Sequence, residues 1–341
     1  MTGSTHSASS GRVEDRRIRG LRTPKPAVDA YAAHGSLLEV ERRPHRAVGG
    51  TAGGTIERAL TVFLAGAECP FTCTFCDLWR WTTDGPTPAG ALPRQLEAVL
   101  HSLDANAPRP DRLKLYNASN FFDRRAVPAA DLPRLAELAA PFAGVTVESH
   151  ASTIGPTTLE FARRLTGRLE VAVGLETIHP RAMAHLNKRL DLAALARATQ
   201  WLADHGMDLR VFVLLGAPYV PSDESVEWTV RAVEHATRCG ASVVSIIPVR
   251  GGNGEMERLE ALGEFTPPTL SQLEDALDRC VELTSAVVTA DLWDVERLLA
   301  CNHCRRPRAE RLARLNVTGR PEPRIVCAAH STGSGQECAA S

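Results

Sequence analysis

Three cysteines close together in the chain are the residues with the clearest chemical potential. Cys69, Cys73 and Cys76 form a Cys-x-x-x-Cys-x-x-Cys segment. Three thiolates at this spacing can bind three irons of a cubic iron–sulfur cluster, which leaves the fourth iron open to a substrate. A structural zinc site needs a fourth ligand close by, whereas the next cysteine after Cys76 is Cys239 and the next histidine is His101. The spacing therefore predicts an iron–sulfur site.

A second group of possible metal ligands lies near the C-terminus. Cys301 and Cys304 form a Cys-x-x-Cys pair, and Cys327 and His330 form a Cys-x-x-His pair. Three interpretations stay open for these residues: an auxiliary iron–sulfur cluster, a tetrahedral zinc site, or thiols that bind no metal.

Composition indicates a soluble globular protein from a reducing compartment. The 341 residues are 44% apolar and 23% charged, with a formal net charge of −1, so the chain has no global basic field for nucleic acid. The nine cysteines are an odd number and make a poor disulfide framework. We expect Cys239 and Cys280 in core helices and Cys338 as a free thiol. Because the sequence has neither an apolar signal region nor a membrane-length apolar run, it predicts a cytoplasmic protein.

Short apolar runs alternate with helical patterns from residue 58 onward. The expected strands cover residues 60–66, 112–117, 144–148, 169–175, 209–215, 242–248 and 287–292. The expected helices cover residues 91–103, 131–142, 157–165, 192–205, 222–239 and 271–283. Continuous apolar strands that alternate with helices are typical of a parallel sheet covered by helices. We therefore expect the α/β class, with a partial or full parallel β/α (TIM-like) barrel and a small C-terminal extension.

Polar residues follow several of the expected strands. In a parallel barrel, functional residues lie at the carboxyl ends of the strands. Asn117 and Ser119 follow the second strand, Glu148 ends the third, and Glu176 follows the fourth. Two simpler interpretations remain open. Asn117 and Ser119 could close a turn, and the two glutamates could form salt bridges at the barrel mouth.

The cysteine segment resembles the signature of the radical S-adenosylmethionine (SAM) superfamily. Phe75 stands just before the last cysteine, and an expected strand comes just before the loop. The Gly-Leu-Glu-Thr sequence that ends in Thr177, with the later Asn-Lys-Arg ending in Arg189, resembles the Elp3-like and archaeosine-synthase-like branch. One departure is that the Gly-Gly-Glu of many relatives is replaced by Asn117-Ala118-Ser119.

The resemblance implies a [4Fe-4S] cluster, SAM as cofactor and reductive cleavage of SAM to a 5′-deoxyadenosyl radical that attacks an organic substrate. It implies that the ribose of SAM contacts Glu176 and that its carboxylate meets Lys188 or Arg189. The full set of expected cofactor-binding residues is Phe75, Asn117, Ser119, Glu148, Glu176, Lys188 and Arg189. An electron donor such as flavodoxin or ferredoxin is the implied partner.

The expected organisation has four parts. Residues 1–57 form a disordered leader and linker, 58–264 the barrel core, 265–304 a helix and strand that complete the barrel, and 305–341 a loosely ordered tail. The arginines between residues 12 and 25 are either an RNA-binding arm or a solvated leader.

Three functions are compatible with these patterns. The neutral charge favours a radical SAM enzyme with a small-molecule substrate, whereas the basic arm and the branch resemblance favour modification of a tRNA nucleoside. The third, in a different class, is a non-catalytic iron–sulfur or zinc-binding protein. The reaction on the substrate is not specified by the sequence.

Overall fold

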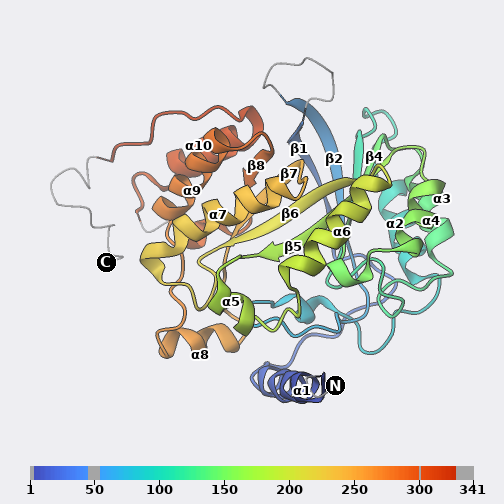
Figure 1. The fold of residues 1–341 in the computed structure, drawn as a ribbon. Coiled ribbons are helices and arrows are strands. Elements are labelled where there is room, and N and C mark those ends of the chain that lie inside the picture. Colours follow the sequence, from blue (N-terminus) through green and yellow to red (C-terminus); the bar gives the residue numbers. More distant parts are fainter. Residues whose placement is uncertain (1–3, 45–53, 299–300, 328–341) are drawn as a thin grey trace.

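The core of the protein is one eight-stranded sheet (Figure 1). The computed structural model describes residues 4–44, 54–298 and 301–327. The strands lie side by side in chain order: β1 (Gly35–Arg43), β2 (Thr55–Leu64), β3 (Arg112–Asn117), β4 (Gly144–Glu148), β5 (Arg168–Glu176), β6 (Asp208–Leu215), β7 (Val243–Pro248) and β8 (Val287–Ala290). β1 is antiparallel to β2, and all later neighbours are parallel. The predicted α/β class and partial β/α barrel are confirmed.

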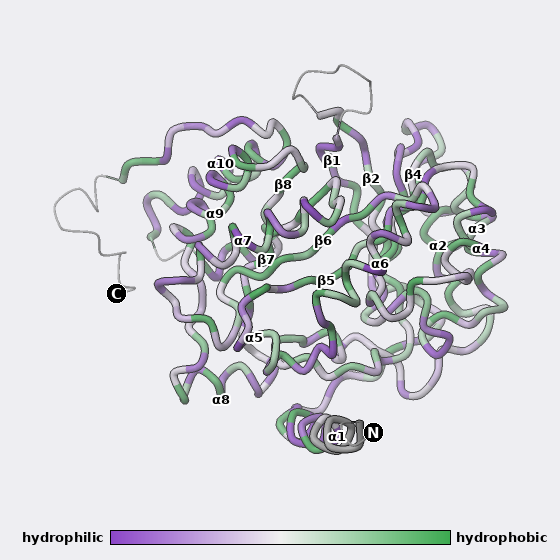
Figure 2. The backbone as a smooth tube through the Cα atoms, viewed as in Figure 1, coloured by the Kyte–Doolittle hydropathy of each residue, from purple (hydrophilic) through white to green (hydrophobic). Residues whose placement is uncertain are grey.

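The helices lie outside the sheet or across its ends. They are α1 (Ser4–Gly20), α2 (Ala91–His101), α3 (Leu132–Ala139), α4 (Pro156–Arg164), α5 (Pro180–His185), α6 (Leu192–Asp204), α7 (Ser225–Arg238), α8 (Glu255–Ala261), α9 (Leu270–Leu283) and α10 (Arg305–Thr318). Local chemistry sets several of their starts. Asp191 caps α6 by accepting from the Ala194 N–H at 2.6 Å, and Thr269 and Gln272 form a capping box at α9. Figure 2 shows the hydrophobic residues running along the central strands, which the helices cover.

A buried ion network shows that the sheet curls on itself. The Arg210 side chain, on β6, donates to Glu41, on β1, at 2.9 Å, and to Glu170, on β5, at 2.6 Å. Lys114, on β3, lies 3.2 Å from Glu41. β1 and β6 are five strands apart in the sheet order, so their side chains meet only if they point into a common interior. The network fills the amino-terminal end of the barrel and leaves the carboxyl end for a ligand.

α10 occupies the seam between the two edge strands. β1 and β8 have no strand pairing with each other among the described residues, and α10 packs against both. The Asn316 side chain accepts from the Ala290 N–H and donates to the Ala290 carbonyl, both at 2.8 Å. One amide side chain thus satisfies the open edge of β8 in the way that a neighbouring strand would.

Regular structure also occurs in two segments where the sequence patterns predicted none. α1 and β1 lie in the expected leader, and α10 lies in the expected tail. The hydrophobic pattern did not predict β1, because its apolar side chains face outward and its charged side chains face the interior. Its inward side chains are charged, such as Glu39 and Glu41, whereas Leu38 and Val40 are 52% and 51% exposed. α10 is rich in arginine, and its fully buried Arg311 is paired with Asp278.

We expect Asn316→Ala to destabilise the protein by about 1–3 kcal/mol, because it leaves the Ala290 N–H and carbonyl without partners at the sheet edge. The free energy of unfolding from urea denaturation measures this. Asn106→Ala, in an exposed loop, is the matched control and should have no measurable effect. Equal stability of the two variants would show that Asn316 does not hold the seam.

Candidate active site at the barrel mouth

The three-cysteine loop leaves the carboxyl end of β2, as the barrel interpretation requires. Its first residues are hydrogen-bonded by side chains of α2 and of the loop before α2. Gln95 accepts from the Ala65 N–H and donates to the Ala65 carbonyl, both at 2.8 Å, and the Thr87 hydroxyl accepts from the Ala67 N–H at 2.8 Å. Cys69, Cys73 and Cys76 follow, each partly buried. The loop is therefore a fixed part of the structure.

Three asparagines from three separate connecting segments hold this loop. Asn120, after β3, donates to Cys69 Sγ at 3.4 Å. Asn187, after α5, donates to the carbonyl of Thr72 at 2.9 Å and to its hydroxyl at 2.8 Å. Asn253, after β7, donates to the carbonyl of Thr74 at 2.8 Å. Asn120 and Asn253 come soon after predicted strands, and that position was the available signal, whereas Asn187 follows the helix α5. The sequence analysis assigned none of the three a role.

Burial raises the pKa of all three thiols. It raises the pKa of Cys69, raises that of Cys73 to about 12 and raises that of Cys76 well above its ordinary value. Thiolate is the metal-binding form, so holding all three as thiolates requires a strongly positive partner in the loop.

The spacing of the three sulfurs separates a cluster from a single ion. Among the described residues, the only group of three metal-binding side chains whose ligand atoms all lie within 4.8 Å of one another is elsewhere in the chain. At least one pair of the sulfurs of Cys69, Cys73 and Cys76 therefore lies more than 4.8 Å apart. A cube binds each thiolate to a different iron, so a wider spacing fits a cluster better than zinc.

A buried ion pair lies beside the cysteines. Lys188 Nζ is 2.5 Å from the carboxylate of Glu176. Although burial lowers the pKa of Lys188, Glu176, Cys73 and Glu148 together raise it above its ordinary value. Gly174, on β5, makes room for the pair, because a Cβ there would overlap both charged groups. This fixed positive charge faces the cysteine loop.

The backbone around this pair adopts conformations that side chains rarely allow. Glu176, Asn187 and Arg189 have φ angles of 69°, 51° and 59°. Each such residue costs on the order of 1 kcal/mol, and strain of this kind clusters at functional sites. Here it turns the Asn187 amide toward the cysteine loop and the Lys188 ammonium toward Glu176.

Two predicted cofactor-binding residues have buried polar atoms without partners. Within the described structure, the amide oxygen and nitrogen of Asn117 and the hydroxyl of Ser119 are buried and make no hydrogen bond. Leaving such groups unpaired costs about 1–3 kcal/mol each, so native proteins rarely do it without a ligand or water. Asn117 ends β3 and Ser119 follows it at the barrel mouth, where the cofactor was expected. They fit a bound molecule with its own donors and acceptors.

Burial also shifts the titration of two neighbouring groups on β4 and its following loop. It raises the pKa of Glu148 to about 7, opposed by Lys188 and reinforced by Glu176. It lowers the pKa of His150 to about 4, with Lys188 acting in the same direction. His150 is therefore neutral near pH 7, and its ring lies 4.2 Å from that of Phe71 in the cysteine loop.

The structure places the remaining two predicted residues away from these polar groups. Phe75 packs against an apolar cluster that includes Tyr219 and Met256. Arg189 lies at the surface, where its side chain forms an ion pair with Asp15 of α1. Of the two cations considered for the SAM carboxylate, Lys188 is the one that is buried beside the cysteines.

α1 docks across the cysteine loop. Asp15 bonds the hydroxyl of Thr72 and accepts from Asn187 at 2.9 Å. Arg17 lies 2.7 Å from Glu255 of α8, and Arg22 lies 2.8 Å from Glu68 in the cysteine loop. These arginines of the expected basic arm are therefore paired with carboxylates of the barrel.

The C-terminal cysteines also come together. Cys301, Cys304 and Cys327 form the group whose sulfurs all lie within 4.8 Å of one another. The fourth predicted ligand, His330, lies outside the described residues, as does Cys338. Cys280 is buried in α9, and Cys239 ends α7 partly buried.

No family model and no curated protein matches the chain. Solved structures with a similar fold include Elp3 from the archaeon Methanocaldococcus infernus (14% identity, 68% of this chain and 56% of that one, TM-score 0.49). Coproporphyrinogen III oxidase (HemN) from Escherichia coli, a radical SAM enzyme, matches at 12% identity over 78% of this chain and 54% of that one (TM-score 0.44). The radical SAM methyltransferase TsrM from Kitasatospora setae matches at 16% identity over 57% and 38% (TM-score 0.40).

This chain spans less than two thirds of the length of each of these proteins. In this chain itself, the three-cysteine motif leaves the first parallel strand of a β/α barrel. None of the described helices is both long and apolar enough to cross a lipid bilayer.

We expect Asn187→Gly to weaken cluster binding, because it removes the amide that holds Thr72 while glycine still accepts the positive φ. The loss of its hydrogen bonds corresponds to about 1–3 kcal/mol. Iron per chain after anaerobic reconstitution, and the rate of iron loss to a chelator, measure the effect. Asn106→Ala is the control. Wild-type iron retention in Asn187→Gly would contradict a role for this residue in holding the loop.

Proposed function

We propose that this protein is a radical SAM enzyme whose [4Fe-4S] cluster is held by Cys69, Cys73 and Cys76. The main support is the cysteine loop itself: three thiols at the mouth of a parallel barrel, in a loop that three asparagines hold in place. When bound and reduced, such a cluster supplies the electron that cleaves SAM into methionine and a 5′-deoxyadenosyl radical.

The polar residues around the loop would bind and orient SAM. Asn117 and Ser119 offer buried amide and hydroxyl groups that lack partners in the protein. Glu148 offers a carboxylate to the cationic part of SAM. Glu176 can accept from the ribose hydroxyls while it keeps its pair with Lys188. Lys188 in turn offers a cation for the SAM carboxylate.

The rest of the barrel would exclude water from the radical. The buried network around Glu170 fills the amino-terminal end of the interior. α1 covers the cysteine loop at the other end through Asp15 and Arg17. A reactive intermediate is protected when its site is closed to solvent.

A small-molecule substrate is the better supported class. Two of the arginines that suggested an RNA-binding arm, Arg17 and Arg22, are paired with Glu255 and Glu68 of the barrel, and the net charge is −1. A tRNA-modifying enzyme remains the alternative. Mobility shift with bulk tRNA at two salt concentrations separates the two, because phosphate binding is strongly salt-dependent. The electron donor is proposed to be a flavodoxin or ferredoxin.

The non-catalytic alternative, a carrier or metal-binding protein, makes a different prediction for SAM. Anaerobically reconstituted protein, given dithionite and SAM, should produce 5′-deoxyadenosine, and Cys76→Ala should abolish both the cluster of the loop and this product. Cys239→Ser, outside both cysteine groups, is the matched control and should retain both. If the cluster is intact and no 5′-deoxyadenosine forms, the proposal that the protein is a radical SAM enzyme is refuted.

The affinity for SAM should rise with pH between about 6 and 8. Glu148 has a pKa of about 7, so it is largely protonated below this pH and becomes a carboxylate above it. A carboxylate attracts the positively charged groups of SAM. Glu148→Gln should bind SAM more weakly at pH 8 and show a flatter pH profile in equilibrium dialysis. A variant with the wild-type pH profile would exclude this role for Glu148.

A further inference from the structure

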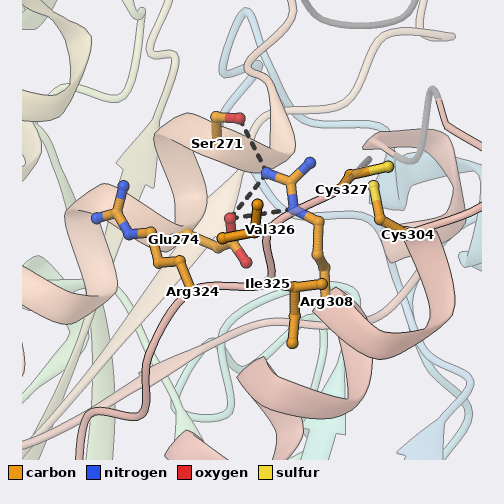
Figure 3. A pocket seen from close by; sticks show the side chains of 8 residues that line it. All are labelled: Ser271, Glu274, Cys304, Arg308, Arg324, Ile325, Val326 and Cys327. Atoms are coloured by element: carbon orange, nitrogen blue, oxygen red, sulfur yellow. Dashed lines mark hydrogen bonds and ion pairs between the residues drawn. The ribbon is translucent and has the colours of Figure 1, made fainter. Parts of the chain in front are cut away.

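Three cysteines distant from the cluster loop in sequence converge at the start of α10. Cys301 and Cys304 are buried just before this helix, and Cys327 ends the segment that returns along it. The sulfurs of Cys301 and Cys327 are 3.9 Å apart, and all three sulfurs lie within 4.8 Å of one another. Figure 3 shows the side chains of Cys304 and Cys327 at one end of a pocket between α9, α10 and the returning segment.

This spacing distinguishes the possible occupants. Zinc binds thiolates at about 2.3 Å, so two sulfurs of a tetrahedral site lie about 3.8 Å apart. The distance between Cys301 and Cys327 matches this value. It is too long for a disulfide, whose sulfurs are about 2.05 Å apart. A cubic cluster would spread three thiolates over three irons, which requires the wider spacing of the first cysteine loop.

An arginine that is paired with a carboxylate lies beside the three sulfurs and can donate to a thiolate. Arg308, one helical turn after Cys304, lies in the same pocket. Its guanidinium is held in place by Ser271 at 2.9 Å and by Glu274 at 2.7 Å (Figure 3). Residues that fix the environment of the ligands are a regular part of metal sites.

We propose that Cys301, Cys304 and Cys327 bind a single zinc ion with a structural role. This site is separate from the proposed radical chemistry, because the residues that line the pocket come only from α9, from α10 with the Cys304 before it, and from the segment 324–327. A structural zinc is four-coordinate, so its fourth position would be filled by a ligand from outside this group, such as a water molecule.

The ion would fasten the segment that returns along α10 to the start of the helix. Arg311 donates to the carbonyl of Glu322 at 2.9 Å, and Arg324 binds Asp278 at 3.0 Å. The ends of the segment between Cys301 and Cys327 would be joined through the metal, and such a link limits the freedom of the unfolded chain. Because α10 occupies the seam between β1 and β8, the zinc would help to keep the barrel closed.

The test uses the full chain with Cys69→Ala, Cys73→Ala and Cys76→Ala, which removes the first cysteine group from the metal count. After expression with zinc, we expect about one zinc per chain by elemental analysis, with no iron and no acid-labile sulfide. Adding Cys327→Ser should reduce zinc to near zero and lower the melting temperature, whereas adding Cys239→Ser should leave both unchanged.

Two outcomes would overturn the proposal. Iron with acid-labile sulfide in the triple variant would mean an auxiliary cluster at the second group. No metal in the triple variant, although its circular dichroism and melting temperature match those of the wild type, would mean thiols without a metal. Neither outcome affects the proposed radical SAM activity, which is measured through 5′-deoxyadenosine in chains that retain the first group. In cobalt-substituted protein, a thiolate-to-metal charge-transfer band lost in Cys327→Ser supports the same ligands independently.

Discussion

The rest of the structure depends on one set of buried ion pairs, in which Arg210 binds Glu41 and Glu170 inside the barrel. These groups come from strands far apart in the sheet, and each carboxylate is buried with its cation. Removing one partner of such a buried set leaves an uncompensated charge, at a cost of about 3–5 kcal/mol. The arginines hold the pKa of Glu41 near 2 against the effect of burial. These charged side chains can therefore form their ion pairs only if the sheet curls and brings β1 close to β6.

The curl determines where the chemistry can occur. Once the amino-terminal end of the barrel is filled, the carboxyl ends of the strands converge on one open mouth. Asn120, Asn187 and Asn253 reach this mouth from separate parts of the chain and bind the same loop. The position of the cysteines is therefore a property of the whole barrel. A change in the curvature would move the three asparagines relative to one another.

The two ends of the chain complete the barrel from outside. α1 lies across the cysteine loop, where Asp15 is shared by Thr72, Asn187 and Arg189. α10 lies along the seam, where Asn316 binds the edge of β8. Both helices are polar and gain little from their own hydrophobic pattern. They are stabilised by specific contacts with the barrel, which accounts for the low predictability of both segments.

The sequence by itself determined the class of the fold and the cluster loop. Strands such as 112–117 and 144–148 were predicted at their observed bounds. Short apolar, β-branched runs between helical patterns are compatible with few structures other than buried strands. The cysteine spacing is a local property and could be read directly. β1 could not be predicted, since its inward side chains are charged and their partners, Lys114 and Arg210, are far along the chain.

Only the tertiary structure decided how the site is held. Nothing local indicates that Asn187 binds Thr72, that Gly174 makes room for Lys188, or that Asn117 is buried without a partner. It also brought together the C-terminal cysteines, for which the sequence left a cluster, a zinc site and unliganded thiols open, whereas it predicted an iron–sulfur site for the first group. Sequence spacing orders ligands along the chain, but the distance between Cys301 and Cys327 depends on how α10 packs against the sheet. Metal preference follows from that distance, because a single ion and a cluster require different separations of their thiolates.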